Sequence, residues 1–321
     1  MVIPRVLCLG EILVDRLADQ PGLPLEAVRS WSDFPGGAPA NVACALAKLG
    51  TAAGFIGCVG QDTWGQTLEA VLQQAGVDIT GLQRHPTAPT RSVYVLRSAT
   101  GDREFAGFGP HPTAAFADTH LRAAALPEAL FETADYLVLG TLGLAHADSR
   151  GAIERALALA ASHGLRVVMD VNWRPRFWPQ PDQAAAMIWP HLPQVDLLKL
   201  SKEEALWLFD TVDPEDIAAS LPQAMGVVIT DGAQGCIYSV AGHRGACPAF
   251  EVAVIDTTGA GDSFVAGLVH QLGQIEPEDR LTAAAIDQIM RYASAVGALT
   301  TLKAGAIAAQ PTAQAVHDFL A

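Results

Sequence analysis

The chain has 321 residues, of which 50% are hydrophobic and 17% are charged, and its formal net charge is −14 at pH 7. A chain of this length can bury a sizeable core. The acidic balance, with no basic patch in the sequence, disfavours nucleic acid and acidic membrane surfaces as partners. No apolar run is long enough to span a bilayer, and the start lacks a signal-peptide pattern, so we expect a cytoplasmic protein.

The five cysteines are widely scattered and form no C-x-x-C pair. This spacing favours reduced, buried thiols over a disulfide framework or a zinc site. The histidines are scattered too, and an H-E-x-x-H motif is absent. We therefore expect no structural transition metal.

In chain order, short apolar runs alternate with longer segments whose apolar residues have helical spacing. Strands are expected at residues 5–10, 55–60, 135–140, 166–171, 196–200, 226–230 and 252–255, and helices at 40–50, 64–76, 149–164, 202–209 and 263–273. Several of the strands lack polar alternation, which is typical of strands buried on both faces. The alternation of strands with helices predicts an α/β fold with a mainly parallel sheet.

Two regions, 11–34 and 88–108, break this alternation with extended segments that alternate polar and apolar residues. They are expected to pair into a small antiparallel sheet with a turn at 99–102, and this sheet would form a lid. Val93, Tyr94 and Val95 would lie on an exposed edge of it. Covering that edge with a second copy is one route to a homodimer through the lid.

The segment EVAVIDTTGAGDSFVAGLVHQL (251–272) places small residues at 259–261, immediately before a helical pattern. Small residues let the backbone approach a ligand, and the first amides of a helix have no partner within the helix. Gly259, Ala260 and Gly261 are therefore a candidate anion site.

Asp262 follows this turn directly. A carboxylate among such amides would repel a resting phosphate, unless it accepts the proton of a sugar hydroxyl while the amides stabilise a transferred phosphoryl group. The helix dipole is expected to lower the pKa of Asp262. Taken alone, a G-x-G-D segment is more often a tight turn before an acidic helix start. The choice between this interpretation and a catalytic site therefore depends on the longer segment 256–267.

DTTGAGDSFVAG (256–267) resembles the C-terminal signature of the ribokinase-like (PfkB) carbohydrate kinases, and GGAPANVA (36–43) with LAKLG (46–50) resembles their N-terminal signature. The similarity continues at 57–62, 170–174, 199–204 and 303–306, and therefore covers nearly the whole chain. The residues of these motifs are most similar to those of the fructokinase branch. The resemblance implies one ribokinase-like three-layer αβα domain over 1–321, with the lid and with ATP as phosphoryl donor.

The sugar-side residues can also be read physically. Gly36 and Gly37 bring bare backbone next to a ligand, Asn41 offers a donor and an acceptor, and Asp15 accepts hydroxyl hydrogens. In isolation a Gly-Gly pair is usually a turn and an Asn a cap. The resemblance implies sugar contacts for Asp15, Gly36, Gly37, Asn41, Asn172, Arg174 and the lid residue Phe105, with Phe108 as an alternative.

On the nucleotide side, the resemblance implies ATP contacts for Lys199, Ser201, Thr230, Gly232, Gly235, Ser294 and Gly305. It also implies that Glu204 orders water around Mg²⁺, and that Asp256 and Thr258 belong to a K⁺ site. Ser201 and Ser294 stand where many relatives carry asparagine. The lid also lacks the arginine that relatives often place after their Glu-Arg-x-Phe segment.

The sequence contains no Walker motif and no dinucleotide-binding glycine pattern after a strand, which argues against a P-loop protein and a dinucleotide-binding enzyme. The absence of G-x-S-x-G argues against an α/β-hydrolase. An ATP-dependent fructose kinase is the favoured function. Another substrate (ribose, a nucleoside or 2-keto-3-deoxygluconate) and a non-catalytic regulatory relative remain as alternatives.

Overall fold

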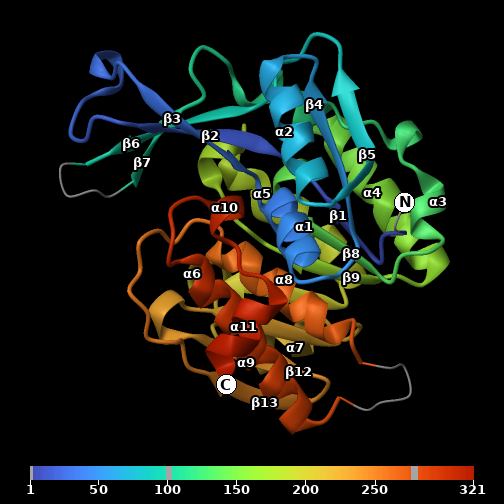
Figure 1. Cartoon of the computed structure of the whole chain (residues 1–321). Coiled ribbons are helices and arrows are strands. Elements are labelled where there is room, and N and C mark those ends of the chain that lie inside the picture. The colour runs from blue at the N-terminus through green and yellow to red at the C-terminus, as the bar shows by residue number, and fades with distance from the viewer. Residues whose placement is uncertain (1–2, 99–102, 276–280) are drawn as a thin grey trace.

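A computed structural model describes residues 3–98, 103–275 and 281–321 (Figure 1). Within these residues the strands form a nine-stranded sheet, in the order β13-β12-β11-β10-β9-β8-β1-β4-β5, and a four-stranded sheet, in the order β3-β2-β6-β7. The large sheet consists of β1 (Val6–Leu9), β4 (Ala53–Gly60), β5 (Asp78–His85), β8 (Tyr136–Gly140), β9 (Arg166–Asp170), β10 (Leu197–Ser201), β11 (Gly226–Thr230), β12 (Cys236–Val240) and β13 (His243–Cys247).

The neighbouring strands β5, β4, β1, β8, β9, β10 and β11 of this sheet run parallel. Strands β12 and β13 are antiparallel additions at one end. The six apolar runs expected from residue 5 to residue 230 are all strands. The sequence reasoning missed β5, β12 and β13. The last two form a hairpin whose turn residues Ala241 and Gly242 have φ values of 50° and 77°, the conformation that a two-residue hairpin turn requires.

Helices cover both faces of the large sheet. They are α1 (Ala38–Lys48), α2 (Thr63–Gln74), α3 (Glu128–Phe131), α4 (Ala147–His163), α5 (Ala184–Ile188), α6 (Lys202–Phe209), α7 (Pro214–Ser220), α8 (Ala260–Leu272), α9 (Ala283–Thr300), α10 (Ala306–Ala309) and α11 (Ala313–Leu320). The five expected helices correspond to α1, α2, α4, α6 and α8. In the described part of the chain, no helix has both the length and the apolar character needed to cross a bilayer.

Strand β1 shows why the fold has three layers. Val6 and Cys8 belong to the core cluster shared with α1, α8 and α9, while Leu7 and Leu9 belong to the cluster shared with α4. Successive side chains of a strand point to opposite faces, so a strand with four buried apolar residues must be covered on both. The sheet lies between these two helical layers, as the α/β prediction requires.

The small sheet projects from one side of the large one (Figure 1). Its strands are β2 (Leu13–Ala18), β3 (Trp31–Gly36), β6 (Ser92–Arg97) and β7 (Arg103–Gly107). The β2–β3 and β6–β7 pairs are antiparallel, but β2 and β6 run parallel, so the sheet is mixed and not purely antiparallel as expected. The turn expected at 99–102 lies outside the described residues.

The placement of β6 contradicts one prediction. Val93, Tyr94 and Val95 are not on an edge, because β6 lies between β2 and β7. Val93 is buried in a small cluster with Leu13 and other apolar residues. An exposed β6 edge therefore gives no reason for a dimer.

The strand expected at 252–255 is also absent. This segment has no strand hydrogen bonding, and the side chains of Val254 and Ile255 are 57% and 68% exposed. The amide of Ile255 donates to the carbonyl of Thr301, 2.8 Å away. The β-branched composition suggested a strand, but the segment has no neighbouring strand with which to pair.

Gly267 allows α8 and α9 to pack closely. A Cβ atom there would lie 2.9 Å from the Cα of Ala293 and 2.9 Å from Cγ2 of Val296. Gly151 in α4 is a matched helical glycine whose Cβ would meet nothing within 4 Å. The first glycine is therefore required by packing, and the second is not.

We predict that Gly267→Ala lowers the free energy of unfolding by about 1–2 kcal/mol, because overpacking outweighs the gain in helix propensity. The matched change Gly151→Ala should raise it by roughly 0.5–1 kcal/mol through propensity alone. Urea unfolding of both variants measures the two changes, and a stabilised Gly267→Ala protein would show that the helices separate at little cost.

Candidate active site

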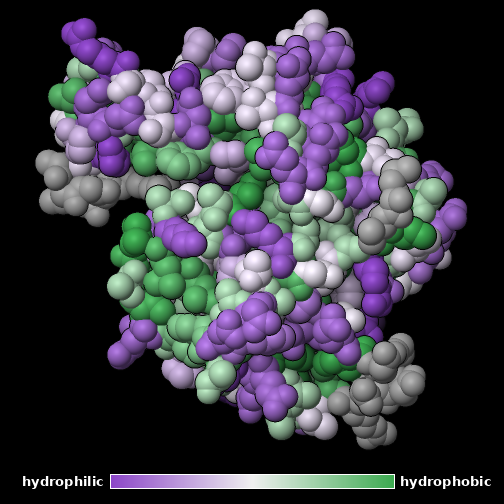
Figure 2. All heavy atoms as spheres, viewed as in Figure 1, coloured by the Kyte–Doolittle hydropathy of each residue, from purple (hydrophilic) through white to green (hydrophobic). Residues whose placement is uncertain are grey.

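A pocket of about 380 Å³ opens at the carboxyl edge of the parallel strands, between the lid and the large sheet. Ligands of parallel α/β proteins collect at this edge. In Figure 2 the outline of the molecule is indented between the lid at upper left and an apolar surface below it. The pocket is lined by Glu11, Leu13, Asp15, Gly37, Ala38, Asn41, Leu142, Asp170, Asn172, Arg174, Phe177, Lys199, Thr257, Thr258, Gly259, Gly261 and Asp262.

The first turn of α8 forms one wall of this pocket. Gly259 caps the helix with φ = 77°, and a Cβ there would lie 2.7 Å from the Cβ of Ala306, so both backbone conformation and space require glycine. Gly259 and Gly261 line the pocket, but Ala260 does not, and its amide donates to the carbonyl of Thr257 at 3.2 Å. The predicted anion site is therefore built around the two glycines.

Asp262 is half-buried in the same wall. The side-chain amide of Asn41 in α1 donates to Oδ2 of Asp262 in α8 at 2.7 Å, which links the two helices through residues 221 positions apart in sequence. Burial raises the pKa of Asp262 to about 6, and Asp170 adds to the rise, while Asn41, Lys199 and Arg174 oppose it. The prediction that the helix dipole lowers this pKa is wrong, because the loss of hydration outweighs the dipole.

Lys199 and Asp170 form a buried ion pair at the base of the pocket. The Nζ atom lies 3.1 Å from each carboxylate oxygen of Asp170. Burial alone would lower the pKa of Lys199, but Asp170, Glu204 and Asp262 raise it overall. A Cβ on Gly261 would be 3.4 Å from Nζ, so a permanent cation lies beside the turn expected to bind an anion.

Glu204 and Ser201 lie at the start of α6, behind the pocket wall. The Glu204 carboxylate accepts from the amides of Trp173 at 2.5 Å and Ser201 at 2.7 Å, and Ser201 Oγ accepts from the Glu204 amide at 3.2 Å. This reciprocal arrangement is a capping box. Burial, with Asp170 nearby, raises the pKa of Glu204. Neither residue lines the pocket directly.

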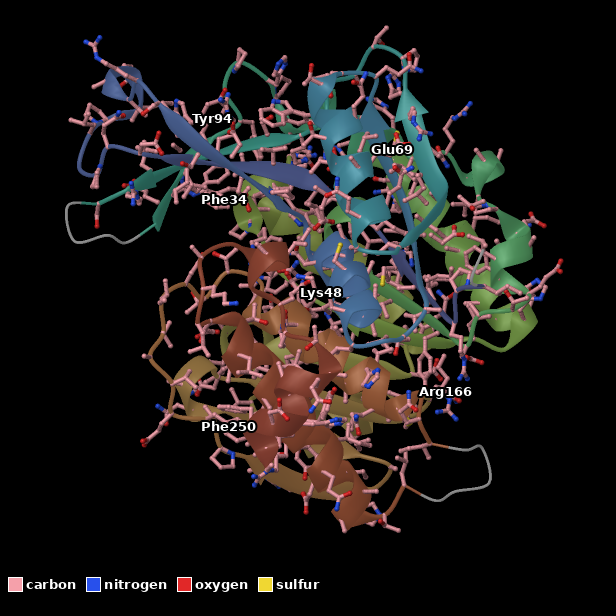
Figure 3. The ribbon with its side chains drawn as sticks, in the orientation of Figure 1. Phe34, Lys48, Glu69, Tyr94, Arg166 and Phe250 are labelled. Carbon is pink, nitrogen blue, oxygen red and sulfur yellow. The ribbon has the colours of Figure 1, made fainter. Side chains whose placement is uncertain are left out.

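Asp256 and Thr258 brace the turn that precedes α8. Asp256 Oδ1 accepts from the amide of Thr258 at 3.0 Å and from its hydroxyl at 2.7 Å, and Oδ2 accepts from the amide of Gly305 at 2.8 Å. Gly305 in turn lies against Phe34 of the lid, whose side chain is labelled in Figure 3. The turn, the loop before α10 and the lid are therefore in contact.

The remaining residues predicted to bind the nucleotide lie farther along the same sheet edge and do not line the pocket. Gly235, with φ = 89°, is pressed against the end of β13, where a Cβ would be 2.1 Å from the carbonyl oxygen of Cys247. Ser294 Oγ on α9 lies 3.6 Å from Sγ of the same cysteine. Gly235 and Ser294 thus converge on Cys247, whereas Thr230 ends β11 and Gly232 lies in the turn after it.

Of the predicted sugar-side residues, Asp15, Gly37, Asn41, Asn172 and Arg174 line the pocket. Gly36 does not line it but lies against Asp15, where a Cβ would be 2.7 Å from Oδ2.

The lid phenylalanines that were expected to cover the sugar do not line the pocket. Phe177 lines it instead, and the rings of Phe105 and Phe108 pack against Phe177 with centroid separations of 5.8 Å and 5.0 Å.

Comparison with known proteins identifies the family. The sequence profile of the pfkB family carbohydrate kinases matches residues 4–313. The chain belongs to this family. It is 35% identical to a probable chloroplastic fructokinase-6 of Arabidopsis thaliana, over 99% of this chain and 82% of that protein.

Two solved structures are also similar. A fructokinase of Xylella fastidiosa with bound ATP has a TM-score of 0.86 and 32% identity, covering 98% of this chain and 97% of its own. A fructokinase of Vibrio cholerae, bound to fructose, ADP and a potassium ion, has a TM-score of 0.85 and 29% identity, covering 99% of each chain. The ribokinase-like fold expected from the sequence is therefore confirmed.

Several pocket residues of this pfkB kinase escaped the sequence reasoning. Glu11 and Asp170 each follow or end a buried strand, so the rule that ligands gather at the carboxyl edge of parallel strands could have found both. Phe177 carries no such signal, because it ends a short 3₁₀ helix, Pro175–Phe177, in the connection after β9.

We predict that Lys199→Met lowers the free energy of unfolding by about 3–5 kcal/mol, because it leaves Asp170 as an uncompensated buried charge. Lys202→Met is the matched control, since Lys202 pairs with Asp231 on the surface at 2.8 Å, and its removal should change stability little. Thermal unfolding compares the two variants. Equal stability losses would contradict the burial argument.

Proposed function

We propose that this protein is an ATP-dependent sugar kinase that transfers the γ-phosphoryl group of ATP to a hydroxyl of fructose. The observation that carries the proposal is the placement of Asp262 in one pocket with Gly259, Gly261 and Lys199. A proton acceptor thereby stands beside a group of anion-stabilising donors. The similarity to fructokinases over nearly the whole chain supports fructose as the acceptor.

In this proposal the sugar lies between the lid and α1. Asp15 accepts hydrogen bonds from hydroxyl groups, Asn41 offers its side-chain amide, and Gly37 lets the backbone come close. Asn172 and Arg174, after β9, line the same pocket. Phe177, backed by Phe105, supplies an apolar surface for the sugar.

The transfer step uses few groups. Asp262 accepts the proton of the attacking hydroxyl, and its pKa of about 6 keeps it ionised near neutral pH while making it a stronger base than an exposed aspartate. The amides of the first turn of α8 and the Lys199 ammonium stabilise charge on the phosphoryl group as it moves. ATP would extend along the sheet edge toward Ser201, Gly305 and the Cys247 region.

The metal ions belong to the same proposal. Glu204 fits an outer role toward Mg²⁺, because its oxygens already accept backbone amides and it would act through ordered water. Mg²⁺ would neutralise phosphate charge. Asp256 and Thr258 would hold K⁺, as the potassium ion bound to the Vibrio cholerae fructokinase suggests. Omitting Mg²⁺, or replacing K⁺ with a larger cation, in kinetic assays tests both roles.

A homodimer through the lid and a cytoplasmic location remain part of the proposal. The dimer would use an outer strand of the lid sheet, β3 or β7, because β6 is internal. Light scattering that shows only monomer at micromolar concentration would contradict it. The cytoplasmic location rests on the thiols, since the five cysteines are all free.

The proposed function is tested with a panel of acceptors in a coupled assay of ADP release. Fructose should give the highest kcat/KM, ahead of ribose, nucleosides and 2-keto-3-deoxygluconate. Success of another sugar with failure of fructose would reassign the substrate. ATP binding without ADP release for any acceptor would instead support a non-catalytic relative.

We predict that Asp262→Asn lowers kcat by at least about 100-fold, because the amide cannot accept the hydroxyl proton. Sugar affinity, measured by calorimetry, should change little. Turnover close to that of the wild type would defeat the assignment of Asp262 as the base.

The pH dependence of kcat should follow the same group. Asp262 accepts a proton only when ionised, so kcat should be constant above its pKa of about 6 and fall as the pH drops through that value. Stopped assays between pH 5 and 8 measure the profile. The residual activity of Asp262→Asn should lack this titration, and an identical profile in the variant would assign the titration elsewhere.

A further inference from the structure

Glu11 follows β1 at the carboxyl edge of the sheet and has no role in the site as described so far. Its side chain is buried, with 7% exposed, and it lines the pocket together with Asp15, Asn41 and Asp262. Oε1 accepts a hydrogen bond from the amide of Ala38 at 3.1 Å. One carboxylate oxygen therefore holds the first turn of α1, the helix that carries Asn41.

This anchoring role does not by itself require a charge. Neutral Ser, Thr and Asn side chains satisfy helix amides about as well as carboxylates do. A buried carboxylate costs several kcal/mol unless it is paired, and no ion pair of Glu11 occurs within residues 3–98, 103–275 and 281–321. Burial raises its pKa to about 7; hydrogen bonds from the backbone of Glu11 and of Ala38 oppose the rise, and Asp118 and Asp262 add to it. A buried carboxylate that lines a pocket without an ion-pair partner is a candidate ligand contact.

Behind Glu11 lies a second, small cavity that is separate from the pocket. Its volume, measured as the space that the centre of a water molecule can occupy, is about 10 Å³. Glu11, Arg91, Asp118 and His146 are among the residues that line it. That volume suits one buried water. Among the described residues, Arg91 Nη1, Asp118 Oδ1 and His146 Nε2 are buried without a hydrogen-bond partner. Glu11 is thus backed by polar groups on one side and faces the pocket on the other.

The polar groups behind Glu11 are held rigidly. Arg91 Nε donates to Asp118 at 2.7 Å, and the side chains of the two residues are 0% and 6% exposed. The rings of Phe108, Phe116 and Phe177 surround the guanidinium at 4.7–5.5 Å. Phe177 also lines the main pocket, so one ring joins the wall of that pocket to Arg91, which lines the small cavity. Glu11 therefore stands in a fixed setting, which favours directional contacts with a ligand.

We infer that Glu11 contacts the sugar: one carboxylate oxygen holds α1, and the other accepts a hydrogen bond from a sugar hydroxyl. The inference rests on the proposed function and narrows its substrate class. Glu11 and Asp15 place two carboxylates on the sugar side, while the cation Lys199 lies on the phosphate side. Neutral polyhydroxylated sugars are therefore favoured over sugar acids, whose carboxylate Glu11 and Asp15 would repel.

Glu11→Gln separates the two roles of this side chain. The glutamine carbonyl still accepts from the amide of Ala38, but an NH₂ group, which only donates, replaces the second oxygen. We expect the dissociation constant for fructose, measured by calorimetry without ATP, to rise about 10- to 100-fold, the effect of losing a hydrogen bond to a charged group. The KM for ATP and kcat at saturating fructose should stay within about 3-fold.

The matched control is Glu69→Gln. Glu69 is a glutamate of α2 (labelled in Figure 3) that is paired with Arg84 and does not line the pocket, so its change should leave fructose binding as in the wild type. Glu11→Asp is measured alongside, because it keeps the charge if the glutamine variant is unstable. It should bind fructose more tightly than Glu11→Gln does. The ratio of 2-keto-3-deoxygluconate affinity to fructose affinity should rise in Glu11→Gln.

Fructose affinity within 2-fold of the wild type in a folded Glu11→Gln protein would overturn the inference and leave Glu11 as a helix anchor only. An unchanged preference against the sugar acid would overturn the specificity argument. Failure of the wild type to phosphorylate fructose is a different result, because it contradicts the proposed function. The same binding comparison is then made with the panel sugar that the wild type does bind.

Discussion

The hydrogen bond between Asn41 and Asp262 joins the two helices on which the pocket depends. It places the first turn of α1, on the proposed sugar side, against the first turn of α8, on the proposed phosphate side. Each turn is also fixed from behind: Glu11 holds α1 through Ala38, and Gly259 of α8 lies against Ala306. Because both helix starts are fixed, Asp262 and the glycine turn before α8 keep one relative geometry, on which the proposed phosphoryl transfer relies.

Desolvation governs the chemistry of this pocket. The chain is strongly acidic, and its pocket gathers four carboxylates, Glu11, Asp15, Asp170 and Asp262, with the cations Lys199 and Arg174. Lys199 is paired with Asp170, so Asp262 remains in a partly dehydrated site with a pKa near 6. A helix start would otherwise favour the ionised form. The result is a carboxylate that is ionised at neutral pH yet basic enough to accept a proton.

Particular residues show how far the sequence predicts the site. From the small residues before α8 and from Asp262, the sequence predicted an anion site beside a proton acceptor. The predicted residues Asp15, Asn41 and Lys199 line the same pocket as Asp262. Ser294 and Gly235 do not line it, although they meet at Cys247 farther along the edge. Sequence patterns report the ends of strands and helices, but not how far apart those ends lie across a sheet.

The sequence by itself determined the alternation of strands and helices, the family, and the short motifs at the sheet edge, because these depend on local periodicity and on residues adjacent in the chain. Only the tertiary structure decided that β6 is internal, that 252–255 forms no strand, that Phe177 takes the place expected for Phe105, and that the pKa of Asp262 is raised. Strand order, ring packing and desolvation all arise from residues distant in sequence, whose approach no local pattern specifies.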